Sequence, residues 1–214
     1  LIVKPGSQTF CESATFGVSN GVQPISKFVL IHTKFTNASR YATWVGGAAL
    51  MLSAIMVTLD VISRKLIGFT ISGSDEISGY VFAASTTWSY SYCLFTRANI
   101  RIDAFYNLLS LKPKAILDMI GLLLLLYYIY LLTTNAFGMF LENVEFNSSA
   151  PTTLATPLWI PQLFWVSGLF FFLLSLAFLS VYGFAALVRG DWATINKIAG
   201  VRTVEEEIIE ETHV

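Results

Sequence analysis

The chain has 214 residues, of which 55% are hydrophobic and only 13% are charged, a composition far from that of a soluble domain. The formal net charge of -1 is uninformative by itself, and no nucleic-acid partner is expected. Two cysteines, Cys11 and Cys93, lie far apart in the sequence, which argues against a disulfide or a zinc site.

Residues 1–40 form a mostly polar segment in which no cleavable signal peptide is expected. Within this segment, residues 25–35 place apolar side chains near helical spacing, with two lysines on other faces. Two interpretations stay open for this stretch. It is either an interfacial helix that lies on the inner leaflet, or a short lead-in to the first membrane span.

Four long apolar runs follow, at residues 43–63, 77–96, 115–141 and 162–188. Because about 20 helical residues cross about 30 Å of hydrocarbon, each run is long enough to span a membrane. The charged stretch 97–114 is too short to span, and an amphipathic helix along the cytoplasmic interface is favoured there. The expected fold is an all-α membrane protein with four transmembrane helices and one or two interfacial amphipathic helices.

The basic residues sort to one side of these runs. Of the 13 Lys and Arg, eleven precede the first run, lie between the second and third, or follow the fourth. Only Arg64 and Lys65 lie in the first outer loop, and the second, 142–161, has none. Because basic loops stay in the cytoplasm, both termini are predicted to be cytoplasmic. The chain then divides into a cytoplasmic segment 1–40, a transmembrane domain 41–190 and a cytoplasmic acidic tail 191–214.

Asp60 lies near the outer end of the first span, one turn before Arg64. A charge at mid-span is usually functional, but one this close to the interface can reach the headgroups and form a pair. We therefore predict a structural Asp60–Arg64 ion pair. Four tryptophans are predicted to anchor the chain at the membrane interfaces: Trp44, Trp159, Trp165 and Trp192.

The second span has the clearest packing pattern. Small residues recur at every fourth position, which favours close approach of another helix; they are Gly79, Ala83, Thr87 and Ser91. A neighbouring stripe is rich in aromatic residues whose polar atoms lipid cannot satisfy; it consists of Tyr80, Ala84, Trp88 and Tyr92. The pattern indicates contact within the helix bundle, contact with another chain, or both.

The spans hold few groups that carry chemistry. His32 and His213 lie outside the four runs, which excludes a bis-histidine haem within the bilayer. No run carries paired carboxylates or a nucleophile with its base, so no enzyme activity and no bound cofactor are expected. Inverted repeats and broken mid-membrane helices, typical of self-sufficient secondary transporters, are not seen. The sequence therefore predicts an accessory membrane component.

Three short segments carry a family resemblance, namely GSDEISGY at 73–80, RANIRID at 97–103 and LATPLWIPQ at 154–162. In this order they resemble the small membrane subunit (DctQ-type) of tripartite ATP-independent periplasmic (TRAP) transporters, over about residues 43–190. The second segment is similar to the family's R-x-H-I-x-V-D signature, with Asn99 in place of its histidine. Gly79 replaces an arginine that many members carry early in the second helix.

The resemblance implies a small permease subunit of a sodium-coupled, binding-protein-dependent secondary transporter in a bacterial or archaeal inner membrane. Its partners would be a large elevator-type membrane subunit, which would hold the sodium, and a periplasmic solute-binding protein. The small subunit would act as a static scaffold, and the imported solute would be an organic acid. The competing interpretation is an autonomous small channel, or a membrane anchor subunit of an unrelated redox complex.

Two sets of contact residues follow from this interpretation. The large-subunit interface is predicted at Gly79, Tyr80, Ala83, Thr87, Trp88, Ser91, Tyr92, Arg97, Arg101 and Asp103. Contact with the binding protein is predicted at the charges of the outer side, which are Arg64, Lys65, Asp75, Glu76, Glu142 and Glu145.

Overall fold

The computed structural model describes residues 24–70, 72–97 and 110–190. Every regular element in these ranges is a helix, which confirms the all-α class. The four helices are α2 (Pro24–Leu66), α3 (Ser74–Phe95), α5 (Leu111–Glu145) and α6 (Trp159–Val188). They correspond in order to the four apolar runs, and each extends beyond its run at one end or both.

Three of the four helices are long and apolar enough to cross a membrane: α2 from His32 onward, α5 and α6. The second predicted span, α3, is not among them, although its 22 residues are enough for the distance. The reason lies in its composition, because serine, threonine and tyrosine make up much of α3 and lower its hydropathy.

Helix α2 is a single uninterrupted helix of 43 residues. At 1.5 Å per residue it is about 65 Å long, about twice the thickness of the hydrocarbon core. No proline or glycine lies between Ile25 and Val45 to end or kink it. Residues 25–35 therefore form the lead-in to the first span, and not a separate interfacial helix. Most of the other predicted interfacial stretch, residues 98–109, lies outside the described residues, and α5 already begins at Leu111.

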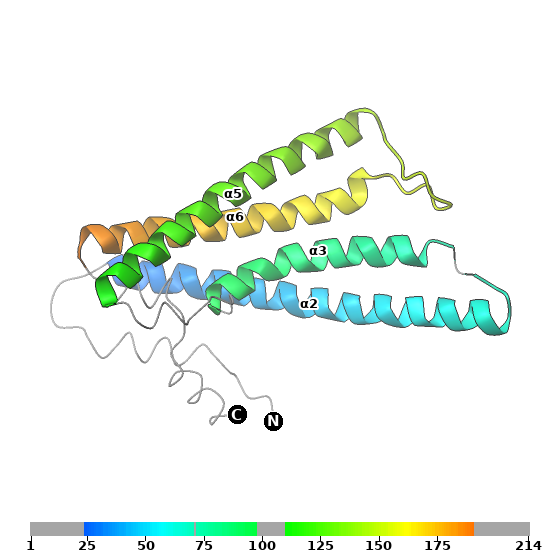
Figure 1. Ribbon diagram of the computed structural model, residues 1–214, viewed down its shortest axis with the longest axis horizontal. Helices are drawn as coiled ribbons and strands as arrows, with labels where there is room; N and C mark the ends of the chain where they lie inside the picture. Colours follow the sequence, from blue (N-terminus) through cyan, green and yellow to red (C-terminus); the bar gives the residue numbers. More distant parts are fainter. Residues whose placement is uncertain (1–23, 71, 98–109, 191–214) are drawn as a thin grey trace, which may run out of the picture.

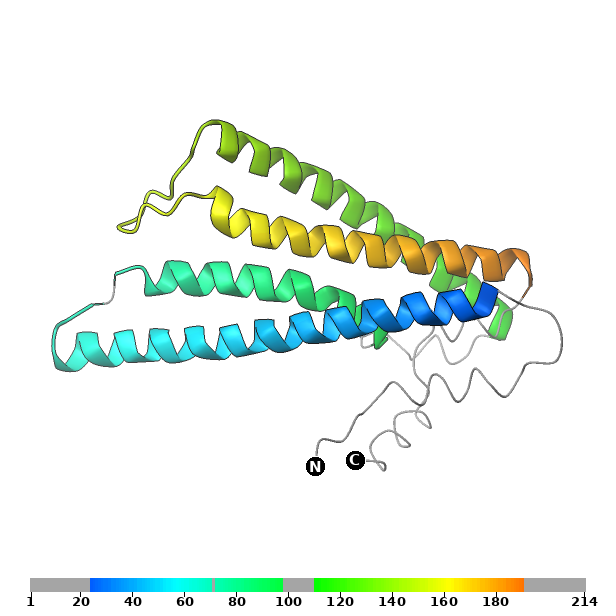
Figure 2. The same ribbon diagram turned by 180° about the vertical axis from the view of Figure 1, so that it is seen from behind.

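The helices form a row in the order α2, α3, α6, α5 (Figures 1 and 2). The main helix contacts are between neighbours in the row, namely α2 with α3, α3 with α6 and α6 with α5, so α2 and α5 lie at its two edges. Both views show α5 diverging from α6 toward the end that carries the α2–α3 and α5–α6 loops, which we call the loop end.

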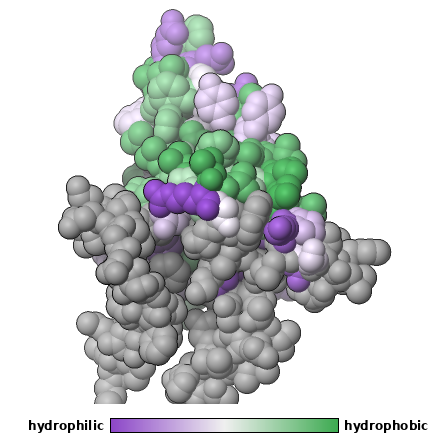
Figure 3. All heavy atoms as spheres, turned by 90° about the vertical axis from the view of Figure 1, so that its left-hand side faces the viewer, coloured by the Kyte–Doolittle hydropathy of each residue, from purple (hydrophilic) through white to green (hydrophobic). Residues whose placement is uncertain are grey.

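The apolar core lies mainly between α5 and α6. Six buried side chains form its largest cluster, one from α3, two from α5 and three from α6: Leu94, Leu122, Ile129, Phe172, Leu176 and Leu179. A smaller cluster nearer the loop end joins Ala136 to Val166 and Leu169. Most other large apolar side chains are exposed, and they colour much of the described surface green when the row is viewed from the end opposite the loops (Figure 3).

Candidate functional site

The predicted Asp60–Arg64 pair is confirmed, and it proves to be part of a joint between two helices. Arg64 donates from Nη2 to Asp60 Oδ2 at 2.5 Å, and the carboxylate is 1% exposed. Ser74, at the start of α3, donates to the same oxygen at 3.1 Å. Asp60 also lies near the N-terminus of α3, where the helix dipole favours a negative charge. The carboxylate therefore fastens the end of α2 to the beginning of α3.

The α5–α6 loop is held to the same end of α3 by Glu76. The two carboxylate oxygens of Glu76 accept from Thr152 Oγ1 at 2.5 Å and from the Tyr80 hydroxyl at 2.7 Å. These hydrogen bonds, that from Thr152 first, hold the pKa of Glu76 below its usual value.

Gly73 brings the loop still closer to α3. It has a left-handed backbone with φ 90°, and a Cβ at this position would collide with the Leu154 side chain. The α5–α6 loop is thus packed on the start of α3 by a steric fit as well as by hydrogen bonds.

The α5–α6 loop is also ordered within itself. Ala150 N–H donates to the Thr156 carbonyl at 2.9 Å, and Leu158 N–H donates to the Ser148 carbonyl at 3.0 Å. Just beyond the loop, Asn143 donates from Nδ2 to Gln162 Oε1 at 3.0 Å, which ties the end of α5 to the start of α6. The loop end therefore presents a fixed backbone surface.

All six charges predicted to contact a binding protein lie at this loop end. Arg64 and Glu76 are engaged within the chain, as described above. The other four are exposed, and they are Lys65, Asp75, Glu142 and Glu145. Their role in binding another protein stays a prediction.

Near the middle of its length, α3 contacts a glycine of each neighbouring helix, Gly46 of α2 and Gly168 of α6. On the α2 side, Ser85 donates to the Gly46 carbonyl at 3.1 Å, and a Cβ on Gly46 would lie 3.1 Å from Ser85 Cβ. On the α6 side, a Cβ on Gly168 would lie only 2.8 Å from Thr87 Cβ, too close for a real contact. Glycine is therefore what lets both pairs of helices approach this closely.

Further polar contacts join α3 to α6. Trp88 donates from Nε1 to the Phe164 carbonyl at 3.0 Å, and its ring stacks on Phe171 with centroids 5.7 Å apart. Ser175 donates to the Ser91 hydroxyl at 3.4 Å, and both side chains are fully buried. The polar atoms that lipid could not satisfy are thus partly satisfied inside the chain.

The predicted large-subunit interface therefore divides into groups. Thr87, Trp88 and Ser91 pack against α6, and Tyr80 is bonded to Glu76. Gly79 is exposed, Ala83 and Tyr92 are half-buried, and Arg97 follows the end of α3 with φ 54°. Arg101 and Asp103 lie outside the described residues. Contact within the chain accounts for the first group, and contact of the remainder with another chain stays a prediction.

Sequence reasoning missed Gly168, Ser74 and the role of Glu76 in holding the loop. Gly168 interrupts a run of large apolar residues in the fourth apolar run, and this was the available signal. Ser74 and Glu76 occur in one of the segments that carry the family resemblance, but no local pattern indicates which distant residues they meet.

An aromatic cluster joins the first half of α2 to α3 and α6. Phe35 stacks on Phe171 and on Phe178, each with centroids 5.8 Å apart, and it also contacts Phe95. His32 packs edge-on against Phe95 at 5.1 Å. Beyond the end of α3, α2 therefore packs directly on α6.

The tryptophans predicted as interface anchors differ in exposure. Trp44 on α2 is 73% exposed and Trp159 at the start of α6 is 37% exposed. Trp165 is half-buried against the smaller apolar cluster, and Trp192 lies outside the described residues. Their placement at membrane interfaces stays a prediction.

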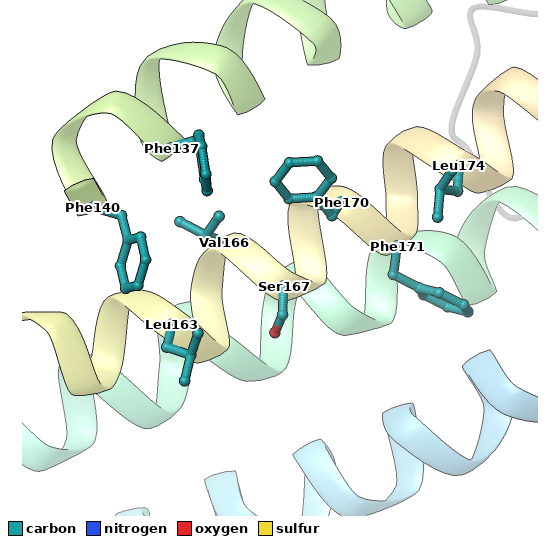
Figure 4. Close-up of a pocket in the computed structure, with 8 residues that line it drawn as sticks. All are labelled: Phe137, Phe140, Leu163, Val166, Ser167, Phe170, Phe171 and Leu174. Atoms are coloured by element: carbon teal, nitrogen blue, oxygen red, sulfur yellow. The ribbon is translucent and has the colours of Figure 1, made fainter.

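A hollow of about 370 Å³ lies between α5 and α6 toward the loop end (Figure 4). Its lining is apolar except for Ser167, whose hydroxyl is bonded to the Phe164 carbonyl at 2.8 Å. Around it stand Phe137, Phe140, Leu163, Val166, Phe170, Phe171 and Leu174. Such a lining offers no charge or free hydrogen-bonding group with which to hold an ionic solute.

In the part of the chain that the structure describes, all regular elements are helices and three of them are long and apolar enough to cross a membrane, which defines a multi-pass membrane protein. Residues 53–190 match the family described as "Tripartite ATP-independent periplasmic transporters, DctQ component", which covers more than half of the sequence. The chain belongs to this family, as the three sequence segments indicated. Comparison with curated proteins and with solved structures gave no match.

Proposed function

We propose that the chain is the small permease subunit of a sodium-coupled, binding-protein-dependent importer and acts there as a static scaffold. The observation that carries this proposal is how the polar groups within the helices are used. Ser85 and Trp88 each donate to a neighbouring helix, and the buried hydroxyls of Ser91 and Ser175 meet between α3 and α6, so these groups hold the helices together and do not line a path for solute. A transporter that moves solute by an elevator motion needs such a rigid partner in the membrane.

The topology we propose has four spans, with both termini in the cytoplasm of a bacterial or archaeal cell. Helix α3 joins the other three as a span because α2 and α6 cover its hydroxyl-rich surface on two sides. The loop end then faces the periplasm, where it carries only two basic residues. This orientation places the ordered α5–α6 loop where a solute-binding protein arrives.

The imported solute is proposed to be an organic acid, and its site and the sodium sites are assigned to the large membrane subunit. On the small subunit, the surface left for contact with that partner on α3 includes Phe82 and Tyr90, both of which are exposed and lie on one side of the helix with Gly79 and Ala83. The predicted second-span joint would use this strip together with Gly79 and Ala83.

Reconstitution tests the proposal. The purified chain in liposomes, with binding protein, organic acid and an inward sodium gradient, is expected to show no uptake. Addition of the large subunit of the same transporter should restore uptake, and potassium in place of sodium should abolish it. Uptake by the small chain alone would contradict the accessory role and favour the autonomous channel.

A further inference from the structure

The outward face of α5, at one edge of the helix row, carries three phenols near the middle of the helix. Tyr127, Tyr128 and Tyr130 are 63%, 60% and 53% exposed. Among the residues that the structure describes, none forms a hydrogen bond with these hydroxyls. Three polar groups therefore point away from the rest of the chain.

Two more polar side chains follow on the same face. Thr134 and Asn135 are exposed, and both donate to the carbonyl of Leu131, at 2.9 Å and 2.7 Å. Thr134 lies seven residues after Tyr127 and Asn135 seven after Tyr128, which is two helical turns in each case. The polar face thus continues for about two and a half turns.

These groups lie at the depth of the hydrocarbon. The apolar run of α5 is 115–141, and any 20-residue window within it contains 122–134. The three phenols therefore stay within the hydrocarbon wherever the span is placed along the run. In a centred span they are about 15 Å from either interface, farther than a tyrosine side chain can reach.

The opposite edge of the row differs. Exposed side chains of α2 at its span are mainly apolar, among them Met51, Leu52, Ile55 and Leu59. Thr58 is exposed there, but its hydroxyl is bonded to the Ala54 carbonyl at 2.8 Å. Such a surface suits lipid chains, whereas the phenol hydroxyls of α5, which stand among the exposed Leu124 and Leu131, find no hydrogen-bond partner in lipid chains.

We propose that the outward face of α5 is a joint within the membrane, covered by a transmembrane helix of the large subunit that offers hydrogen-bonding side chains. This inference rests on the proposed function and adds the outward face of α5 to the surface of α3 proposed above for contact with the same partner. Gly138, one turn after Thr134, has open space where a Cβ would lie, so a helix can come close there. A second copy of the chain is the competing occupant, because a tyrosine hydroxyl both donates and accepts, and the crosslinking test below separates it from the large subunit.

Photo-crosslinking tests the assignment on the assembled complex in membranes. Benzoylphenylalanine is placed singly at Tyr127 on α5, at Phe82 on α3 and at Leu52 on α2, which are 63%, 60% and 69% exposed. We expect a covalent adduct with the large subunit from position 127, and much less from 52. An adduct from 82 or 52 with none from 127, equal adducts from all three, or a dimer of the small chain from 127 would each overturn the inference.

Removal of the hydroxyls alone is the second test. Tyr127→Phe, Tyr128→Phe and Tyr130→Phe keep the ring and the helix, so folding is preserved. Each lost hydrogen bond should weaken association with the large subunit about threefold, and the triple variant about 20-fold. Tyr41→Phe, on an exposed position of α2, is the control and should leave association unchanged.

Unchanged co-purification of the triple variant would show that the hydroxyls do not hold the joint. If the unaltered chain itself fails to co-purify with the large subunit, the proposed function fails instead. The two failures are therefore distinguishable.

Discussion

Helix α3 is fastened in two different ways along its length. At the loop end it is held by charged groups, with Asp60 accepting from Ser74 and Glu76 accepting from Thr152. In its middle it is held by shape, because Thr87 fills the space above Gly168. The hydrogen bonds to Asp60 and Glu76 depend on the protonation of the carboxylates and on solvent. The packing of Thr87 on α6 depends on the absence of a side-chain methyl group at Gly168.

The difference follows from what surrounds each part. In the four-span topology proposed above, the loop end is in water, so a carboxylate such as Glu76 can stay charged there while it orders a loop. In the same topology the middle of α3 is inside the membrane, where the gain from helix association comes from close packing and a few hydrogen bonds, and small residues permit both. Four changes to the chain test or refine this contrast.

The largest effect is expected from Arg64→Ala. This change removes the guanidinium 2.5 Å from the Asp60 carboxylate, which is 1% exposed and keeps its hydrogen bond from Ser74. Removing one member of a buried ion pair costs about 3 kcal/mol or more, and the 53% exposure of Arg64 places this pair at the lower end. Chemical unfolding in detergent measures the loss. Lys65→Ala, at the exposed neighbouring residue, should change stability by less than about 0.5 kcal/mol. Equal effects of the two changes would mean that the Asp60 joint contributes little.

Gly168→Ala should follow, with a loss of about 1–3 kcal/mol, because the new methyl group collides with Thr87 and Trp88. Gly79→Ala is the matched control, since nothing lies within 4 Å of its added Cβ. Alanine favours the helix, so the control should be neutral or slightly stabilising. Thermal unfolding of both variants in the same detergent compares them, and a stable Gly168→Ala variant would contradict the steric joint.

A smaller, pH-dependent effect is expected at Glu76. Its pKa is lowered in the folded chain by hydrogen bonds from Thr152 and Tyr80. The resulting stabilisation is complete above the ordinary glutamate pKa, about 4.3, and is lost as the pH falls through the lower folded value. Hydrogen exchange at the Ala150 amide, which the loop protects, should rise in that acidic range relative to its intrinsic rate.

Glu76→Gln should make this protection nearly independent of pH, because an amide does not titrate in this range. Glu142→Gln, at an exposed residue of the same end, serves as the control. If both variants keep the pH dependence of the unaltered chain, Glu76 is not the group that holds the loop.

The smallest effect is expected from charge reversal at the loop end. Reversal of the four exposed charges, Lys65, Asp75, Glu142 and Glu145, should weaken binding-protein docking only modestly, since an exposed pair contributes about 0–1 kcal/mol. The affinity of the binding protein for the complex at low and high salt measures it. Identical affinities at both salt concentrations would place the contact elsewhere, for example on the backbone of the α5–α6 loop.

Features determined by neighbours in the sequence could be predicted, and long-range pairings could not. The apolar runs fixed the four helices to within a few residues at most ends, since hydropathy changes sharply there. The Asp60–Arg64 pair was predictable because its members are one turn apart. The small stripe of α3 indicated a joint, but the sequence does not show that Gly168, some 80 residues later, lies opposite Thr87.

Two features could not be decided from the sequence for related physical reasons. An amphipathic stretch before a span can bend along the membrane or continue straight, and here the helix continues from Ile25 to Val45 without proline or glycine while Phe35 packs on α6. The order of the helices in the row likewise depends on contacts between distant segments. The sequence shows three tyrosines in the third apolar run, but it does not show that their side chains point outward from the helix row.

The length of α2 limits how the chain can stand in a bilayer. A straight rod of about 65 Å would have to lie about 60° from the membrane normal to stay within 30 Å of hydrocarbon, whereas transmembrane helices tilt by up to about 40°. At that limit about 20 Å of its height still lies outside the hydrocarbon. One end of α2 therefore extends as a continuous helix beyond the hydrocarbon. The ring contacts of Phe35 with α6 would couple a movement of the first half of α2 to the other helices of the row.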